Sequence, residues 1–149
     1  MIAYLDSSAL VKRYVSERGS ETVANVAAEA SFVGISVIGR AEVEAALVRA
    51  VRLGVISESG GSAAREAFAH EWDSFLRISA TEAIVARAGS LAWAHGLRGY
   101  DSVHLASALT WRDGTGEQVS MVTFDKELMR AAAAERLDVT PTQTGVDPP

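Results

Sequence analysis

Four acidic residues lie where predicted strands end or predicted helices begin. Asp6 directly follows the first predicted strand, and Asp125 follows a later strand with a single residue between. Glu42 lies in the first turns of a predicted helix, and Asp101 begins another. In α/β sheets, ligands bind in the crevice beyond the carboxyl ends of the strands. We therefore expect these four carboxylates to face one crevice, although they lie far apart in the sequence.

Carboxylates that meet in one crevice favour a cation between them. Without a cation, they repel one another and raise each other's pKa. The chain has no cysteine, and its three histidines do not cluster. Oxygen ligands alone indicate Mg²⁺ or Mn²⁺ and not zinc. One or two such ions can generate hydroxide and stabilise the leaving oxygen of a phosphodiester, so this chemistry needs no histidine as the general base.

Each carboxylate also has an ordinary structural explanation. Asp6, Asp101 and Asp125 are all well placed as helix N-caps, a role that stabilises a helix by about 1 kcal/mol. For Glu42 the alternative is a solvated residue on a helix surface. Capping is the commoner role for any one aspartate, but the combination of four such positions favours a metal site.

The elements that must position these residues alternate between strand and helix. Runs of β-branched residues predict strands at 2–5, 32–37, 76–78 and 119–123, and a last short strand around Val139. Helical spacing of apolar residues predicts helices around 10–15, from Ser20, over 40–53, from Ser57 or Ser62, from Thr81 to His95, over 100–111 and over 125–136, with a turn at 112–116. This alternation is typical of an α/β domain with a mainly parallel sheet covered on both faces.

Length and composition indicate one domain. The 149 residues are 48% hydrophobic, which is enough for a packed core. We expect a domain at 1–140 and a loose tail at 141–149. The start has no basic leader and no apolar stretch is long enough to cross a bilayer, so we expect a cytoplasmic protein with no membrane partner. The net charge of −5 argues against a nucleic-acid binder, but less so if several carboxylates bind cations.

Four short segments resemble, in order, the PIN-domain family, and in particular its VapC-type toxins. Residues 4–10 (YLDSSAL) resemble the opening of such a domain, and residues 40–43 (RAEV) resemble its Arg-x-Glu segment. Residues 100–106 (YDSVHLA) resemble its second aspartate segment, and residues 122–128 (VTFDKEL) its Thr-x-Asp segment. The resemblance extends from Ile2 to about Val139.

This resemblance implies a fold, an activity and partners. The fold is a three-layer α/β/α sandwich with a mainly parallel central sheet. The activity is Mg²⁺- or Mn²⁺-dependent endonucleolytic cleavage of RNA, which leaves a 5′-phosphate and a 3′-hydroxyl. The partners are an RNA substrate, an antitoxin that wraps the helices and reaches the acidic site, and a second copy in a homodimer.

The resemblance also assigns residues. The acidic positions that hold the metal correspond to Asp6, Glu42, Asp101 and Asp125. The hydroxyl positions that support them correspond to Ser8 and Thr123. The basic residues near the predicted mouth are candidates for RNA contacts, with solvated surface as the alternative: Lys12, Arg13, Arg40, Arg98 and Lys126.

Several residues keep two interpretations. Glu44 points to a largely different side of its helix from Glu42, and either contributes to the site or faces water. His104 either orients a carboxylate or is a hydrogen-bonded structural histidine. We expect Trp93 and Trp111 to be packing residues.

Two alternative functions remain open at this point. Carboxylate chemistry does not itself choose the sugar, so a metal-dependent DNA nuclease is one alternative. A PIN-like binding module without catalysis is the other.

Overall fold

The computed structural model describes residues 1–142, which form one parallel sheet with helices on both faces. The strands within these residues are β1 (Ile2–Leu5), β2 (Phe32–Ser36), β3 (Leu76–Ile78), β4 (Val119–Val122) and β5 (Asp138–Thr140). Their order across the sheet is β3-β2-β1-β4-β5, and every neighbouring pair is parallel. The predicted α/β fold with a parallel sheet is confirmed.

Helices form the connections between the parallel strands. They are α1 (Ser7–Leu10), α2 (Ser20–Glu29), α3 (Gly39–Arg52), α4 (Glu58–Glu71), α5 (Glu82–His95), α6 (Gly99–Thr115) and α7 (Lys126–Ala134). Two short 3₁₀ turns, η1 (Val11–Arg13) and η2 (Trp72–Ser74), follow α1 and α4.

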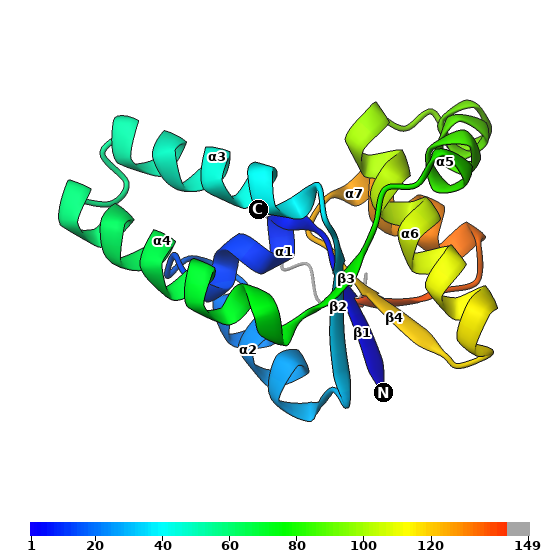
Figure 1. Ribbon diagram of the computed structural model, residues 1–149, viewed down its shortest axis with the longest axis horizontal. Helices are drawn as coiled ribbons and strands as arrows, with labels where there is room; N and C mark the ends of the chain where they lie inside the picture. Colours follow the sequence, from blue (N-terminus) through cyan, green and yellow to red (C-terminus); the bar gives the residue numbers. More distant parts are fainter. Residues whose placement is uncertain (143–149) are drawn as a thin grey trace.

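The central strand β1 shows how the two outer layers are divided. Its side chains alternate in direction, as they must in a strand. Ile2 and Tyr4 pack in the core with α5, α6 and α7, whereas Ala3 and Leu5 pack in the core with α1, α2, α3 and α4. Figure 1 shows these two groups of helices on opposite sides of the sheet. The result is a three-layer α/β/α sandwich.

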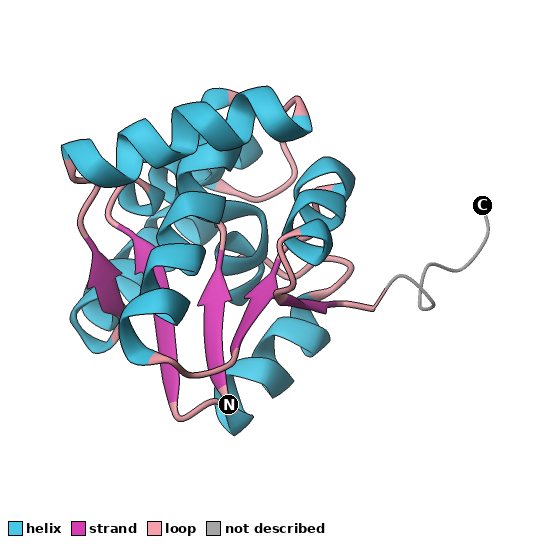
Figure 2. Ribbon diagram, turned by 90° about the vertical axis from the view of Figure 1, so that its right-hand side faces the viewer, coloured by secondary structure: helices cyan, strands magenta, loops and turns pink. Residues whose placement is uncertain are grey.

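Parallel strands bring three connections to one edge. The segments that leave β1, β2 and β4 lead into α1, α3 and α7. Figure 2 shows the central strands side by side, with their arrowheads at the same edge of the sheet. The residues that follow these strands, among them Asp6 and Asp125, therefore lie at this edge.

Three predicted helix ends are confirmed by their caps, whereas the helix predicted around 10–15 is wrong in its bounds, because α1 ends at Leu10 and the 3₁₀ turn η1 follows. The side chains of Ser57 and Thr81 accept hydrogen bonds from Gly60 N and Ile84 N at the starts of α4 and α5. The choice between Ser57 and Ser62 is thus decided for Ser57. Gly96 has a φ of 66° and ends α5 in the left-handed conformation, which glycine adopts without strain.

The predicted turn at 112–116 is wrong, because α6 continues to Thr115 and ends only at Gly116. A glycine inside a helix costs only about 1 kcal/mol relative to alanine, and Gly114 is tolerated at this cost. Arg87 of α5 pairs with Asp113 at 2.8 Å, and Trp111 is buried. Contacts with the rest of the fold therefore hold the last turn of α6.

Trp93 also departs from expectation. Trp111 is buried as predicted, but the side chain of Trp93 on α5 is 93% exposed.

No helix within residues 1–142 is both long and apolar enough to cross a membrane. Of the tail predicted at 141–149, only Pro141 and Thr142 belong to the described residues, and 143–149 lie outside them.

Candidate metal centre

Asp6 lies at the centre of the carboxyl edge, where β1 ends and α1 begins. It is buried and caps α1 by accepting a hydrogen bond from Ala9 N at 3.0 Å. Ser8 Oγ donates to Asp6 Oδ1 and Thr123 Oγ1 donates to Oδ2, both at 2.7 Å. Burial raises the pKa of Asp6 above its ordinary value, and the hydrogen bonds offset only part of this rise. The site therefore holds the Asp6 carboxyl group in a fixed position, with too little positive charge nearby to offset the effect of burial on its pKa.

Glu42 enters from the first turn of α3 and is fixed by a buried histidine. His104 Nε2 lies 2.6 Å from Glu42 Oε1, and Ser7 Oγ donates to the same oxygen at 2.7 Å. Burial acts to raise the pKa of Glu42, but the contacts with His104 and Ser7 outweigh it, so the pKa is lowered. Glu42 is therefore held as a carboxylate.

The orientation of His104 is set by Tyr4 of β1. Tyr4 Oη lies 2.7 Å from His104 Nδ1 and accepts a hydrogen bond from Ser36 N at 3.1 Å. The Glu42 carboxylate can only accept a hydrogen bond, so the ring nitrogen Nε2 of His104 carries the proton that faces it. His104 thus has both of the roles that the sequence left open, since it is buried in the structure and also orients a carboxylate.

Asp101 and Asp125 share one cation, which is the guanidinium of Arg98. Arg98 Nε donates to Asp101 Oδ2 and Arg98 Nη2 donates to Asp125 Oδ2, each at 3.0 Å. Asp125 also caps α7 through Leu128 N. Asp101 caps no helix, which corrects one of the capping predictions: α6 already begins at Gly99, with Arg98 at the N-cap position. The Asp101 carboxylate is consequently available for a ligand.

Hydroxyl groups join these pairs into one network. Thr123 Oγ1 donates to Asp6 and accepts from Asp125 N at 3.2 Å. Ser8 Oγ donates to Asp6 and accepts from Phe124 N at 3.1 Å. The predicted supporting hydroxyls are therefore in contact with the carboxyl edge, and they tie the end of β1 to the end of β4.

The chemistry of the donor atoms fits a hard divalent cation, but the side chains of the described residues do not surround one point. The four carboxylates offer only oxygen atoms, which Mg²⁺ and Mn²⁺ prefer. The guanidinium between Asp101 and Asp125 shows that these two already arrange their oxygens around one positive charge. As the side chains lie, however, no three histidine, aspartate or glutamate residues within 1–142 form a group around one point. In this arrangement the guanidinium of Arg98 occupies the position between Asp101 and Asp125.

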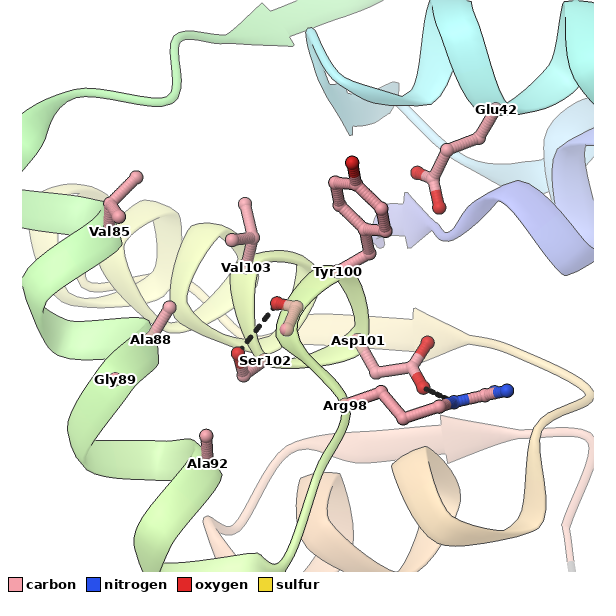
Figure 3. A pocket seen from close by; sticks show the side chains of 11 residues that line it. Glu42, Val85, Ala88, Gly89, Ala92, Arg98, Tyr100, Asp101, Ser102 and Val103 are labelled. Atoms are coloured by element: carbon pink, nitrogen blue, oxygen red, sulfur yellow. Dashed lines mark hydrogen bonds and ion pairs between the residues drawn. The ribbon is translucent and has the colours of Figure 1, made fainter.

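A cavity of about 630 Å³ opens beside this network (Figure 3). Glu42, Asp101 and Arg98 form its charged edge. Its other walls come from α5 and the first turns of α6. Two of the four carboxylates, Glu42 and Asp101, therefore line a space large enough for a small ligand.

The other basic candidates lie in different surroundings. Lys12 pairs with Glu17 and lies 4.6 Å from the ring centroid of Phe124. Arg13 pairs with Glu71. Arg40 stacks over Trp72 at 5.5 Å, and Lys126 is an exposed residue at the start of α7. Of the five, only Arg98 lines the cavity with the carboxylates, and contact of any of them with RNA stays a prediction.

Sequence reasoning missed Ser7 and Tyr4 and left Glu44 undecided. Ser7 has no signal beyond its place beside Asp6. Tyr4 has a weak one, since a tyrosine in a buried strand needs a hydrogen-bond partner for its hydroxyl. Glu44 pairs with Arg65 at 2.7 Å in the groove between α3 and α4. It therefore faces away from the acidic site.

Two curated relatives cover almost the whole chain. The protein is 33% identical over 142 residues to "Ribonuclease VapC45" of Mycobacterium tuberculosis (strain CDC 1551 / Oshkosh), with 95% of this chain and 96% of that protein covered. Identity and coverage are the same for "Ribonuclease VapC49" of Mycobacterium tuberculosis strain H37Rv.

Solved structures with the same fold include a chain of a complex described as a toxin–antitoxin complex. A chain of a toxin–antitoxin complex from Klebsiella pneumoniae aligns with a TM-score of 0.65 at 19% identity, covering 94% of this chain and 98% of that one. A chain of FitAcB from Neisseria gonorrhoeae aligns with a TM-score of 0.62 at 19% identity, covering 93% and 96%. At these identities the likeness establishes the fold alone. The PIN domain family matches residues 3–134, so this chain belongs to the PIN domain family.

Proposed function

We propose that this protein is a divalent-metal-dependent endoribonuclease and the toxin of a toxin–antitoxin pair. The observation that carries the proposal is the buried carboxylate of Asp6, linked through Thr123 to Asp125, which in turn shares one cation with Asp101. The 33% identity to two proteins named ribonuclease supports the choice of RNA.

In this proposal the metal is Mg²⁺ or Mn²⁺, held by Asp6, Asp101 and Asp125 with help from Glu42. When bound, such an ion supplies a nucleophile at neutral pH by lowering the pKa of water, and it neutralises charge on the phosphate. The cleavage leaves a 5′-phosphate on one product and a 3′-hydroxyl on the other. The cavity beside the carboxylates is where the RNA lies.

The chain's own residues prepare the site for this reaction. Ser8 and Thr123 fix the two oxygens of Asp6, and His104 and Ser7 fix Glu42 as a carboxylate. These contacts hold the acidic groups before substrate arrives, so little reorganisation is needed at the moment of reaction. Arg98, once released from the carboxylates, is placed to contact a phosphate with its planar set of donors.

The experiment that tests the proposal compares wild type with Asp6→Asn on a mixed cellular RNA pool, with Mg²⁺, with Mn²⁺ and with EDTA. We expect metal-dependent cleavage by wild type and a loss of more than about 100-fold in the variant. The matched control is Asp73→Asn on η2, since Asp73 is exposed and pairs only with Arg77 among the contacts described. Wild-type cleavage by a contaminant-free Asp6→Asn preparation would remove Asp6 from the site.

The nucleic acid is tested with matched single strands of RNA and DNA. We expect cleavage of the RNA strand and at least about tenfold slower cleavage of the DNA strand, because contacts with the 2′-hydroxyl distinguish the two. Equal rates would indicate a general metal-dependent nuclease. Absence of both cleavage and Mn²⁺ binding in a titration would indicate a binding module without catalysis.

The partner protein is proposed from the descriptions of solved structures that share this fold. The Klebsiella pneumoniae structure is described as a toxin–antitoxin complex, and another fold relative, VapBC2 from Rickettsia felis, is described as bound to a DNA fragment from its promoter. We expect the antitoxin of this protein to inhibit cleavage, and we expect the protein itself to form a homodimer. Cleavage assays with and without a candidate antitoxin test the first expectation, and mass measurement of the purified protein tests the second.

A further inference from the structure

The cavity beside the acidic site has two different sides. One side is the charged edge formed by Glu42, Asp101 and Arg98. The other side is apolar, and most of its residues are small: Val85, Ala88, Gly89 and Ala92 of α5 and Val103 of α6. Figure 3 shows the α5 residues facing those of α6 across this space. A ligand that fills the cavity must therefore combine an apolar body with a charged group.

Tyr100 is the aromatic residue of this cavity. It lies in the first turn of α6, directly before Asp101, and it is 68% exposed. Figure 3 shows its ring between Val103 and Glu42, on the boundary between the apolar and the charged side. Burial in the core does not explain a tyrosine at this position, whereas stacking on a flat ligand does.

We propose that this cavity is a nucleobase subsite, which takes the base of the nucleotide next to the scissile phosphodiester, with Tyr100 stacked on that base. The inference rests on the proposed function and names the substrate group that the site holds. A single-stranded nucleotide carries a flat apolar ring on one side and a phosphate on the other. Proteins bind such strands by stacking bases on aromatic side chains beside a cationic groove.

The continuity of the cavity with the carboxylates favours this occupant. Asp101 and Arg98 belong both to the cavity and to the pair of contacts around the shared cation position. An apolar peptide would cover the α5 side but would make no use of Arg98, whose exposed guanidinium lies at the charged edge. A nucleotide satisfies both sides at once, because its phosphate lies where the cation and Arg98 can reach it.

Two helical glycines provide a matched pair of variants. A Cβ atom added at Gly89, in α5, or at Gly114, in α6, meets no atom within 4 Å among the described residues. Gly89 lines the cavity, whereas Gly114 is exposed near the other end of α6. Gly89→Leu should therefore fill part of the cavity without disturbing the protein, and Gly114→Leu should change only the helix. Both should raise the unfolding temperature by roughly 2–4 °C, because glycine is a poor helix former.

The experiment measures kcat/KM for a short fluorogenic single-stranded RNA with Mn²⁺. We expect Gly89→Leu to lower kcat/KM by roughly 5- to 100-fold and Gly114→Leu to leave it unchanged. We expect Tyr100→Ala to lower it by roughly 5- to 100-fold, the usual effect of losing one stacked base. Phe32→Ala is the aromatic control, since Phe32 is 60% exposed but begins β2 at the opposite edge of the sheet.

A substrate with one base removed identifies the group in the cavity. Replacing successive nucleotides by abasic ones should lower wild-type kcat/KM strongly at one position next to the cleaved bond. At that position the abasic change should have little further effect in Gly89→Leu, because both changes remove the same interaction. Mn²⁺ titration of Gly89→Leu should give the wild-type affinity, which shows that the carboxylates are undisturbed.

Three outcomes would overturn the subsite. Unchanged kcat/KM in Gly89→Leu would show that RNA does not enter the cavity. Additive effects of the abasic change and of Gly89→Leu would place the base elsewhere. A changed oligomeric state of Gly89→Leu in size-exclusion chromatography would assign the cavity to a second copy of the chain. If the wild-type protein does not cleave RNA, both the proposed function and the subsite are wrong. If the wild-type protein is active and Gly89→Leu is equally active, only the subsite is wrong.

Discussion

At the scale of the single residue, Asp6 is an acidic side chain in a buried position, where the charged form is disfavoured. Both of its oxygens accept hydrogen bonds, yet it is buried at the end of the central strand. Burial raises its pKa, and the nearby charge of His104 and the hydrogen bonds to its oxygens offset only part of this rise. Its charge therefore lowers the stability of the metal-free protein, although the same side chain caps α1.

We predict that Asp6→Asn stabilises the metal-free protein at neutral pH. A carboxyl whose pKa is raised on folding leaves stability unchanged below its ordinary pKa of about 4 and reduces stability as the pH rises through the folded pKa. Asparagine has the same shape and no charge. Urea denaturation in EDTA should therefore give equal midpoints at about pH 4 and a higher midpoint for the variant at pH 7. A lower midpoint at pH 7 would show that the charge of Asp6 is already compensated.

Arg98 provides the second prediction at this scale. Its guanidinium occupies the position between Asp101 and Asp125, and its side chain is 80% exposed and able to leave. Removing this internal cation should strengthen the binding of an external one. Arg98→Gln should bind Mn²⁺ more tightly than wild type, on the order of fivefold at low salt, with a smaller difference at high salt.

Isothermal titration with Mn²⁺ measures this difference. The control is Arg65→Gln, which removes the same charge from an exposed ion pair with Glu44 away from the site. Its Mn²⁺ affinity should equal that of wild type. Weaker binding in Arg98→Gln would mean that Arg98 supports the metal site and does not compete for it.

At the scale of the element, the helix starts distinguish helix capping from ion pairing with Arg98. Asp125 performs both tasks, since one oxygen caps α7 at 2.9 Å from Leu128 N and the other contacts Arg98. Asp101 lies inside the first turn of α6, where it contacts Arg98 but caps no helix. Helix α6 also carries Tyr100 and, one turn later, His104, so a single element presents three groups to the site.

The double task of Asp125 can be divided by two substitutions. Asparagine caps a helix as well as aspartate does, whereas alanine does not. We predict that Asp125→Asn and Asp125→Ala lose Mn²⁺ affinity to the same extent, but that Asp125→Ala is less stable than Asp125→Asn by about 1 kcal/mol. Chemical denaturation in EDTA and Mn²⁺ titration of the two variants measure the two effects separately. Equal stability of the two variants would show that the cap contributes nothing.

At the scale of the whole molecule, the distance between the sheet and α6 decides how the site is assembled. Gly34 of β2 lies under the ring of Trp111, and a Cβ atom at Gly34 would be 2.4 Å from Trp111 Cζ3. This close approach lets α6 pack directly on the sheet. Asp101 and His104 at its start can then reach the edge where Asp6 and Glu42 lie.

We predict that Gly34→Ala destabilises the protein by roughly 1–3 kcal/mol, because the buried Trp111 ring must shift to admit a methyl group. Gly114→Ala in the same helix meets open space and should stabilise the protein by about 1 kcal/mol. Thermal unfolding of both variants checks the signs. A neutral Gly34→Ala would show that α6 can move away from the sheet at little cost.

The sequence by itself determined the elements and the positions of the acids along them. Strands such as 2–5 follow from runs of apolar residues, and the starts of α4 and α5 follow from capping residues whose partners lie three residues away. Because parallel strands share one carboxyl edge, the places of Asp6 and Asp125 were also predictable. These features depend on neighbours in the chain, which a sequence displays directly.

Only the tertiary structure decided the contacts of the site. Tyr4 orients His104 across 100 positions in the sequence, and Arg98 spans 27 positions to reach Asp125. The end of α6 and the exposure of Trp93 were mispredicted for the same reason, since both depend on how α5 and α6 pack on the rest of the fold. Periodicity states which face of an element is apolar, but the order of the strands and the packing of side chains decide which distant residues that face meets.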